Sequence, residues 1–425
     1  MATDNRQMWT ELGIDLAQHD VLLGGLGPAY QEIYLSQKNR PKGMGFFDFV
    51  VGDIHGIRVS ELREHAKKGG KVVATYCVFV PEEFVWAAGG IPVGLCAGAH
   101  FSVPLAEEVL PRNTCPLIKS SFGFKLGRLC PYVQSSHLIV GETTCDGKKK
   151  MFETLGQYQP VYVMEVPNKK TKYSRALWAG EVSEFRTVIE KLTGNKITFE
   201  NLKEATKKVN NRRRALQRLY NLRKGSPVPI SGKDALLVTQ VSFYDDVTRN
   251  TQMVNALCDE LDERVKSKTG VIPADAPRIL VSGSPMAIPN WKVHHLLESA
   301  GAAVVCEESC TGTRAFSDLV DEGAATLEAQ VNAIADRYMK INCACFTPND
   351  ERQSDIVRLA KEYKVDGVVH YNLQFCQTYA NEGSKVEKTL AKEGIPLLRL
   401  ETDYSDEDAG QLRTRIDAFL EMIRK

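Results

Sequence analysis

The sequence lacks several patterns that would assign a protein quickly to a class. No C-x₂-C pair occurs, which removes the usual spacing of structural zinc sites and of ferredoxin-type clusters. No hydrophobic run approaches the length of a membrane span, and the N-terminal residues have no apolar core of a signal peptide. We therefore expect a cytosolic protein, whose thiols stay reduced.

A strong charge of one sign is also missing. The chain has 54 lysine and arginine residues against 53 aspartate and glutamate residues, so its formal net charge is +1. This balance gives no electrostatic case for binding nucleic acid or an anionic membrane. The basic runs at 148–150 and 212–214 are expected to be solvent-exposed helix faces, and residues 207–223 are a candidate surface for docking a partner.

Familiar catalytic patterns are scarce as well. Residues 141–150, Gly-Glu-Thr-Thr-Cys-Asp-Gly-Lys-Lys-Lys, look like a phosphate-binding loop but lack its glycine spacing and the Ser or Thr after lysine. Nothing resembles a Ser-His-Asp set. His370, which precedes Cys376 by six residues, is expected to be a hydrogen-bonded structural residue. The sequence therefore names no catalytic acid or base.

Cysteine, by contrast, is abundant: the chain has eleven. In a reducing compartment this number indicates metal or redox chemistry rather than disulfide cross-links. Most of these cysteines follow an apolar run that predicts a strand and precede a predicted helix. The carboxyl ends of parallel strands line the ligand crevice of an open sheet, and helix N-termini there lower the pKa of a thiol.

The hydrophobic pattern predicts two α/β regions, because short apolar runs alternate with helical patterns in each. In the first region we expect strands at 71–77, 91–96, 137–141 and 160–166, with helices at 81–89, 115–127 and 146–155. In the second region we expect strands at 277–284, 302–306, 341–346, 367–371 and 395–401, and helices at 290–300, 328–340, 350–363, 376–393 and 408–425.

These patterns predict an α/β fold with two Rossmann-like parallel-sheet domains. The remaining residues read as helical, in an N-terminal segment and in a connector between the sheets. The expected divisions are a mainly helical segment at 1–70, a first cluster-binding domain at 71–170, a helical connector at 171–274 and a second cluster-binding domain at 275–425. A duplicated unit of this kind would bring cysteines from both halves together across one cleft.

Thiolate ligands from separated loops favour an iron–sulfur cluster over zinc, because sulfur is a soft ligand and the paired zinc spacing is missing. The candidate ligands are Cys77, Cys115, Cys145, Cys310, Cys345 and Cys376. Two choices stay open, since Cys343 is an alternative to Cys345 and Cys306 to Cys310. The hydroxyls that flank Cys310 are expected to hydrogen-bond cluster sulfur.

Four cysteines are expected elsewhere. Cys96 and Cys258 read as small buried apolar residues. Cys130 and Cys306 are expected to be core residues, or to lie next to the metal site without binding the metal.

Four segments together resemble the 2-hydroxyacyl-CoA dehydratase/benzoyl-CoA reductase superfamily, and within it the double-cubane cluster proteins. They are Val-Ala-Thr-Tyr-Cys-Val-Phe-Val-Pro-Glu-Glu (73–83), Cys-Pro-Leu-Ile-Lys-Ser-Ser (115–121), the 141–150 stretch and His-Tyr-Asn-Leu-Gln-Phe-Cys (370–376). The resemblance runs from about residue 71 to the C-terminus. It implies two Rossmann-like domains with an iron–sulfur cluster in the cleft between them.

The resemblance also implies how the cysteines are divided. By motif order, Cys115, Cys145 and Cys376 correspond to the three ligands of the single cubane in dehydratase members. Double-cubane members add three ligands for a second cubane, and a bridging sulfide completes an [8Fe–9S] cluster. For these three we choose Cys77, Cys310 and Cys345.

The expected function is therefore that of an oxygen-sensitive cytosolic reductase, as a homodimer, that receives low-potential electrons from a separate ATP-hydrolysing iron–sulfur activator and reduces a small molecule. One alternative is a 2-hydroxyacyl-CoA dehydratase or aryl-CoA reductase subunit with a single [4Fe–4S] cluster. Another is a non-catalytic iron–sulfur electron-transfer protein.

Overall fold

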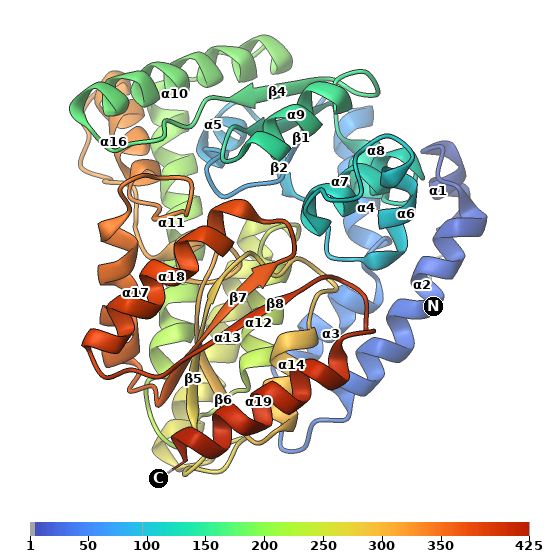
Figure 1. The fold of residues 1–425 in the computed structure, drawn as a ribbon. Helices are drawn as coiled ribbons and strands as arrows, with labels where there is room; N and C mark the ends of the chain where they lie inside the picture. The colour runs from blue at the N-terminus through green and yellow to red at the C-terminus, as the bar shows by residue number, and fades with distance from the viewer. Residues whose placement is uncertain (1–4, 96, 425) are drawn as a thin grey trace.

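The computed structural model describes residues 5–95 and 97–424. It contains two four-stranded, all-parallel sheets with strand orders β2-β1-β3-β4 and β6-β5-β7-β8. Figure 1 shows the two sheets in separate halves, each surrounded by helices. The predicted fold class is confirmed.

The first sheet is built from short apolar runs in its first half. Its strands are β1 (Val72–Thr75), β2 (Ile91–Gly94), β3 (Leu138–Glu142) and β4 (Val161–Met164). Its helices are α5 (Glu82–Ala87), α6 (Val103–Glu107), α7 (Pro116–Leu126), α8 (Pro131–Ser135) and α9 (Asp146–Leu155), with a short 3₁₀ turn η2 (His100–Ser102). All five residues of β3 are buried, as expected of a central parallel strand.

The second sheet repeats this plan. Its strands are β5 (Arg278–Gly283), β6 (Ala303–Glu308), β7 (Gly367–Leu373) and β8 (Leu397–Thr402). Its helices are α14 (Lys292–Ser299), α15 (Thr313–Phe316), α16 (Leu327–Met339), α17 (Asp350–Glu362), α18 (Gln377–Lys392) and α19 (Ala409–Ile423). The central strand β7 is buried along its whole length.

The prediction of a strand at 341–346 is wrong. These residues form a turn-rich loop between α16 and α17, and the second sheet passes directly from β6 through these helices to β7. Ile341 and Phe346 are buried in an apolar cluster instead of a sheet. The side chain of Asn342 donates to Asp355 at 2.5 Å, a polar contact that holds the loop against α17.

The remaining helices join the halves. The N-terminal part contains α1 (Arg6–Glu11), α2 (Leu16–Tyr30), a π-helical turn η1 (Gln31–Leu35), α3 (Met44–Gly52) and α4 (Ile57–Lys67). The part between the sheets contains α10 (Lys172–Thr193), α11 (Phe199–Leu222), α12 (Gly232–Val241) and α13 (Val247–Lys266). Helix α11 contacts α5 of the first half and α15 and α16 of the second, so it fixes one half against the other (Figure 1).

An apolar cluster also spans the two halves. It contains Val73 of β1, Trp178 of α10 and Tyr338 of α16, all of them buried. The indole nitrogen of Trp178 donates to the carbonyl oxygen of Ala335 at 3.1 Å. Within residues 5–95 and 97–424, no helix combines the length and the apolar composition that crossing a membrane requires.

Candidate functional site

A cavity of about 610 Å³ lies where the carboxyl ends of both sheets meet. Residues that follow strands of the first sheet line one side, and residues that follow strands of the second line the other. This is the position at which open α/β sheets bind ligands.

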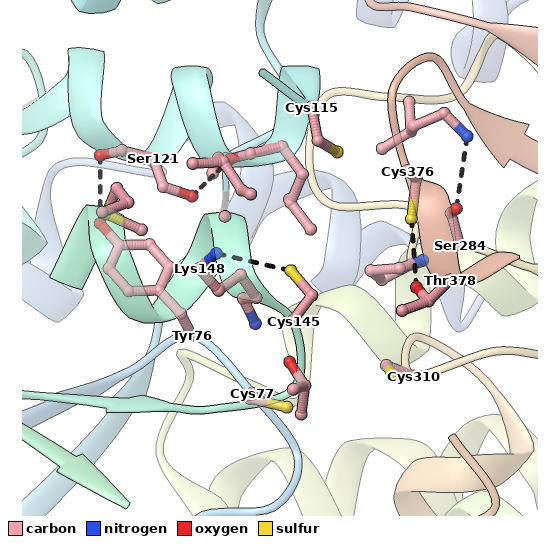
Figure 2. Close-up of a pocket in the computed structure, with 18 of the residues that line it drawn as sticks. Tyr76, Cys77, Cys115, Ser121, Cys145, Lys148, Ser284, Cys310, Cys376 and Thr378 are labelled. Carbon is pink, nitrogen blue, oxygen red and sulfur yellow. Dashed lines mark hydrogen bonds between the residues drawn. The ribbon is translucent and has the colours of Figure 1, made fainter. Parts of the chain in front are cut away.

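Seven cysteines line this cavity. They are the six candidate ligands, Cys77, Cys115, Cys145, Cys310, Cys345 and Cys376, together with the alternative Cys343. Figure 2 shows Cys77 and Cys145 on one side of the cavity and Cys310 and Cys376 on the other. The expectation that both halves contribute cysteines to one cleft is confirmed, and Cys343 and Cys345 remain alternatives.

Three of these cysteines begin helices. Cys115, Cys145 and Cys376 are the N-cap residues of α7, α9 and α18. The Sγ of Cys145 accepts from the backbone N–H of Lys148 at 3.4 Å (Figure 2). Free N–H groups and the helix dipole at such positions favour a negative charge on sulfur.

The seven thiols fall into two groups. Cys115 and Cys145 both interact electrostatically with Cys376. In the second group, Cys343 and Cys345 interact electrostatically with each other and with Cys310. Cys77 interacts with Cys310 and Cys343, and so belongs to the second group.

Burial raises the pKa of most of these thiols despite the helix N-termini. It raises the pKa of Cys145 above its ordinary value and that of Cys310 to about 11. Cys376 differs, because the neighbouring Cys115 thiol lowers its pKa. The neighbouring Cys345 thiol lowers the pKa of Cys343 in the same way.

The other described cysteines lie away from the cavity. Cys130, Cys258 and Cys306 are buried, and none lines the cavity. The predicted core role of Cys258 is confirmed, and the structure favours Cys310 over Cys306 as a cavity residue. Cys96 lies outside the described residues. All ten described cysteines are free thiols.

A buried ion pair borders the first half of the cavity. Glu142, the last residue of β3, is fully buried and binds the ammonium of Lys148. The same carboxylate accepts from the hydroxyl of Thr144 at 3.0 Å. The expectation that the 148–150 run forms a solvent-exposed face is therefore wrong for Lys148, which lines the cavity.

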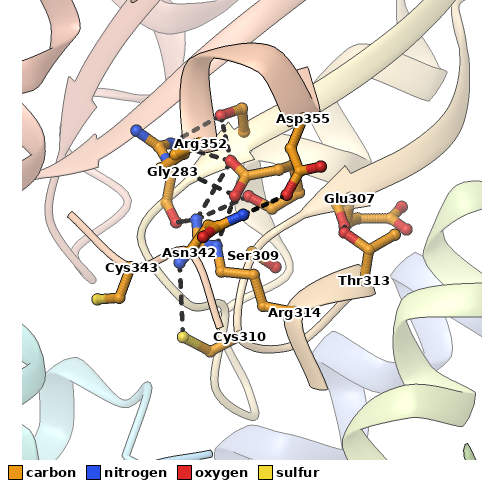
Figure 3. A network of polar contacts seen from close by, with 12 residues as sticks. Gly283, Glu307, Ser309, Cys310, Thr313, Arg314, Asn342, Cys343, Arg352 and Asp355 are labelled. Atoms are coloured by element: carbon orange, nitrogen blue, oxygen red, sulfur yellow. Dashed lines mark hydrogen bonds and ion pairs between the residues drawn. The ribbon is translucent and has the colours of Figure 1, made fainter. Parts of the chain in front are cut away.

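A second buried network lies behind Cys310 (Figure 3). Glu308, the last residue of β6, accepts from Arg314 Nε at 2.6 Å and from Arg352 Nη2 at 2.9 Å. Arg314 Nη1 donates to Cys310 Sγ at 3.5 Å and also bonds the Tyr379 hydroxyl. That hydroxyl lies 3.8 Å from Cys343 Sγ.

Sequence reasoning missed the roles of Lys148 and Arg314. The sequence does contain one signal for these two residues, a shared spacing. In each half a glutamate at the end of a strand is followed by a cysteine two or three residues later and by a cation six residues later. The hydroxyls of Ser309 and Thr311 hydrogen-bond each other at 3.2 Å, and their expected role toward cluster sulfur stays a prediction.

Two further expectations have clear outcomes. His370 is buried, and its Nε2 lies 3.1 Å from the carbonyl oxygen of Tyr379, so its structural role is confirmed. In the run at 212–214, Arg214 is exposed as expected, but Arg213 is buried against Glu83 and Arg212 is largely covered in its pair with Glu82.

The donor set of the cavity fits an iron–sulfur cluster. Among the described residues, no three His, Cys, Asp or Glu side chains are gathered closely enough to hold a single metal ion. The thiolate ligands of a cluster need not meet at one point, because each binds a different iron on the outside of the inorganic core. Thiols spread around the wall of one cavity match that requirement.

Comparison with known proteins agrees with this site. Residues 77–423 match the family model described as 2-hydroxyglutaryl-CoA dehydratase, D-component. The match covers most of the chain, and the chain belongs to this family, whose members include iron–sulfur-cluster subunits. The resemblance to the wider superfamily is thereby confirmed, and membership supports an enzyme.

Several curated relatives match over nearly their whole length. The chain is 40% identical to YjiM of Escherichia coli (strain K12), a protein named as a dehydratase subunit, over 86% of this chain and 94% of the relative. It is 24% identical to the (R)-phenyllactyl-CoA dehydratase beta subunit of Clostridium sporogenes, over 85% and 94%. It is 20% identical to one of the subunits of benzoyl-CoA reductase from Thauera aromatica, over 85% and 93%.

Proposed function

We propose that this chain is a low-potential reductase that holds a double-cubane [8Fe–9S] cluster in its cysteine cavity. The observation that carries the proposal is the set of seven thiols, drawn from both halves, that line one cavity. A bound cluster would supply one-electron transfer at low potential, which no protein side chain provides.

The division of the thiols supports two cubanes rather than one. Cys115, Cys145 and Cys376 would hold the first, and their helix N-caps would stabilise the thiolate charge. Cys77 and Cys310, with Cys345 or Cys343, would hold the second. The domain division at residues 71–170 and 275–425 belongs to the same proposal, since each domain supplies ligands to both groups.

The proposed reaction partners follow from the same chemistry. The chain would work as a cytosolic homodimer, accept electrons from a separate ATP-hydrolysing iron–sulfur activator and pass them to a small molecule in the cavity. Cys77, Cys145, Cys310 and Cys376 are half-buried, so the cavity has a path to solvent for such a substrate.

A second candidate function is that of a dehydratase or aryl-CoA reductase subunit with one [4Fe–4S] cluster. The names of the relatives favour it, because they describe dehydratase and reductase subunits. The second group of thiols would then have no metal to bind. A non-catalytic electron-transfer protein is a third candidate, and it predicts no turnover of any substrate.

Iron and acid-labile sulfide content of the anaerobically purified chain separates these candidates. About eight iron atoms per chain supports the double cubane, and about four supports the single-cubane subunit. Cys310→Ser should lose iron, whereas Cys258→Ser, which alters a buried thiol outside the cavity, should keep it. A chain that takes up no iron on reconstitution would overturn the cluster proposal.

A further inference from the structure

The two halves share an arrangement of charges at the cavity. In each half one strand ends in a buried glutamate. In the first half this residue is Glu142 of the central strand β3, and in the second it is Glu308 of the edge strand β6. Each glutamate binds a cation six residues further along the chain, Lys148 and Arg314. A candidate cluster ligand lies between glutamate and cation in both cases.

In the first half the ammonium of Lys148 is the positive end of the pair and lines the cavity. The Glu142 carboxylate that binds it is fully buried, and the side chain of Lys148 is nearly so, which shields the pair from solvent. Cys77, Cys145 and Cys310 line the same cavity. The charge of Lys148 therefore lies at a space that both groups of thiols share.

In the second half, Glu308 and a backbone carbonyl oxygen bind the guanidinium of Arg314 on the side away from Cys310. Its Nε and Nη2 bind Glu308, and Nη2 also donates to the carbonyl oxygen of Gly283 at 2.8 Å. Its Nη1 donates to Cys310 Sγ at 3.5 Å and also bonds the Tyr379 hydroxyl (Figure 3). The positive charge therefore lies beside Cys310, and the Tyr379 hydroxyl links the guanidinium to Cys343.

We propose that Lys148 and Arg314 are a pair of positioning residues that set the reduction potential of the cluster held by the cavity thiolates. The inference rests on the proposed function. A fixed positive charge beside the ligands favours the state with the extra electron, and burial keeps solvent from screening it. The buried carboxylates hold both cations in place at the cavity, so the field needs no rearrangement on reduction.

The test is an EPR-monitored redox titration of the reconstituted chain under anaerobic conditions. Lys148→Gln and Arg314→Gln should each make the cluster harder to reduce, by about tenfold in the reduction equilibrium, which is about 59 mV for one electron. Arg314→Lys keeps the charge and should restore most of the shift. Lys119→Gln is the matched control, because Lys119 is similarly buried and paired with Glu107 but does not line the cavity.

The outcomes separate the inference from the proposed function. Wild-type chain without iron would contradict the proposed function itself. Loaded wild type, with glutamine variants whose potentials equal that of the Lys119 control, would overturn only the inference. If a single variant loses its iron, the test is repeated with Glu142→Gln combined with Lys148→Gln, which removes both charges of the ion pair. The reduction potential of the cluster is then measured in this double variant. A more negative potential then supports the inference, and an unchanged potential or lost iron overturns it.

Discussion

Glu307 offers the sharpest test of the buried electrostatics, because it lies beside Glu308 in β6 but does not line the cavity. Its carboxylate accepts two hydrogen bonds from Arg223, from Nη1 at 2.7 Å and from Nη2 at 2.9 Å. The hydroxyl of Tyr220 donates to it at 2.5 Å, and Nε2 of His294 lies 3.0 Å away. Glu307 and Arg223 are both fully buried.

The pKa of Glu307 gives the size of the effect. Burial alone would raise it, but the charge and hydrogen bonds of Arg223 lower it from 4.5 to about 2. At about 1.36 kcal/mol per pKa unit this difference corresponds to about 3 kcal/mol of folding stability. Because the folded-state pKa is the lower one, the contribution is present above pH 4.5 and is lost as the pH falls toward 2. Near pH 3 about 1 kcal/mol should remain.

Glu307→Gln keeps the shape of the side chain and removes the charge, so it should destabilise the chain by about 3 kcal/mol at pH 7. Equilibrium urea unfolding of wild type and variant, each at pH 7 and pH 3, measures this. Other titrating groups cancel in the comparison at each pH, and the difference between the two proteins should shrink at pH 3. A difference that is equal at both pH values would refute the electrostatic reasoning, because packing alone would then explain it.

Two other substitutions test the packing that positions the site. Gly312→Ala should lower the iron content, because the new Cβ would lie 2.3 Å from the carbonyl oxygen of Glu307 and displace the loop that carries Cys310. Gly147→Ala is the control and should keep its iron, because its Cβ would meet only the flexible end of the Ile118 side chain, at 2.8 Å. Trp178→Ala should lower the urea midpoint by a stability loss of about 3–5 kcal/mol, since it removes a fully buried side chain between the halves; a loss below about 1 kcal/mol would contradict that packing.

The sequence predicted the strands that end in the cavity because their signal is local. The run that forms β3 is short, apolar and followed by a helix-starting segment, and α9 spans Asp146–Leu155 as expected. The run at 341–346, Ile-Asn-Cys-Ala-Cys-Phe, is also short and largely apolar and also precedes a helix. Its Asn342 is held by Asp355 and its apolar ends pack in a cluster, contacts that depend on tertiary structure and that no local pattern reveals.

The same limit explains the charges. A lysine or arginine run on a polar helix is usually solvated, which is why Lys148 and Arg213 were expected at the surface. Their acidic partners decide otherwise: Glu142 lies six residues before Lys148, but Glu83 is 130 residues from Arg213. A buried cation requires a buried anion, and only the fold shows which glutamates are buried.

The arrangement of the cavity follows from a single geometric fact about parallel sheets. Every strand of a parallel sheet ends at the same edge, so the loops after β1 and β3 of one sheet and after β6 and β7 of the other can all reach one space. These loops supply Cys77, Cys145, Cys310 and Cys376, and glutamates at the ends of β3 and β6 bind the two cations. The other three cavity thiols, Cys115, Cys343 and Cys345, come from loops that precede helices α7 and α17. Neither half contains a complete set of ligands for either thiol group.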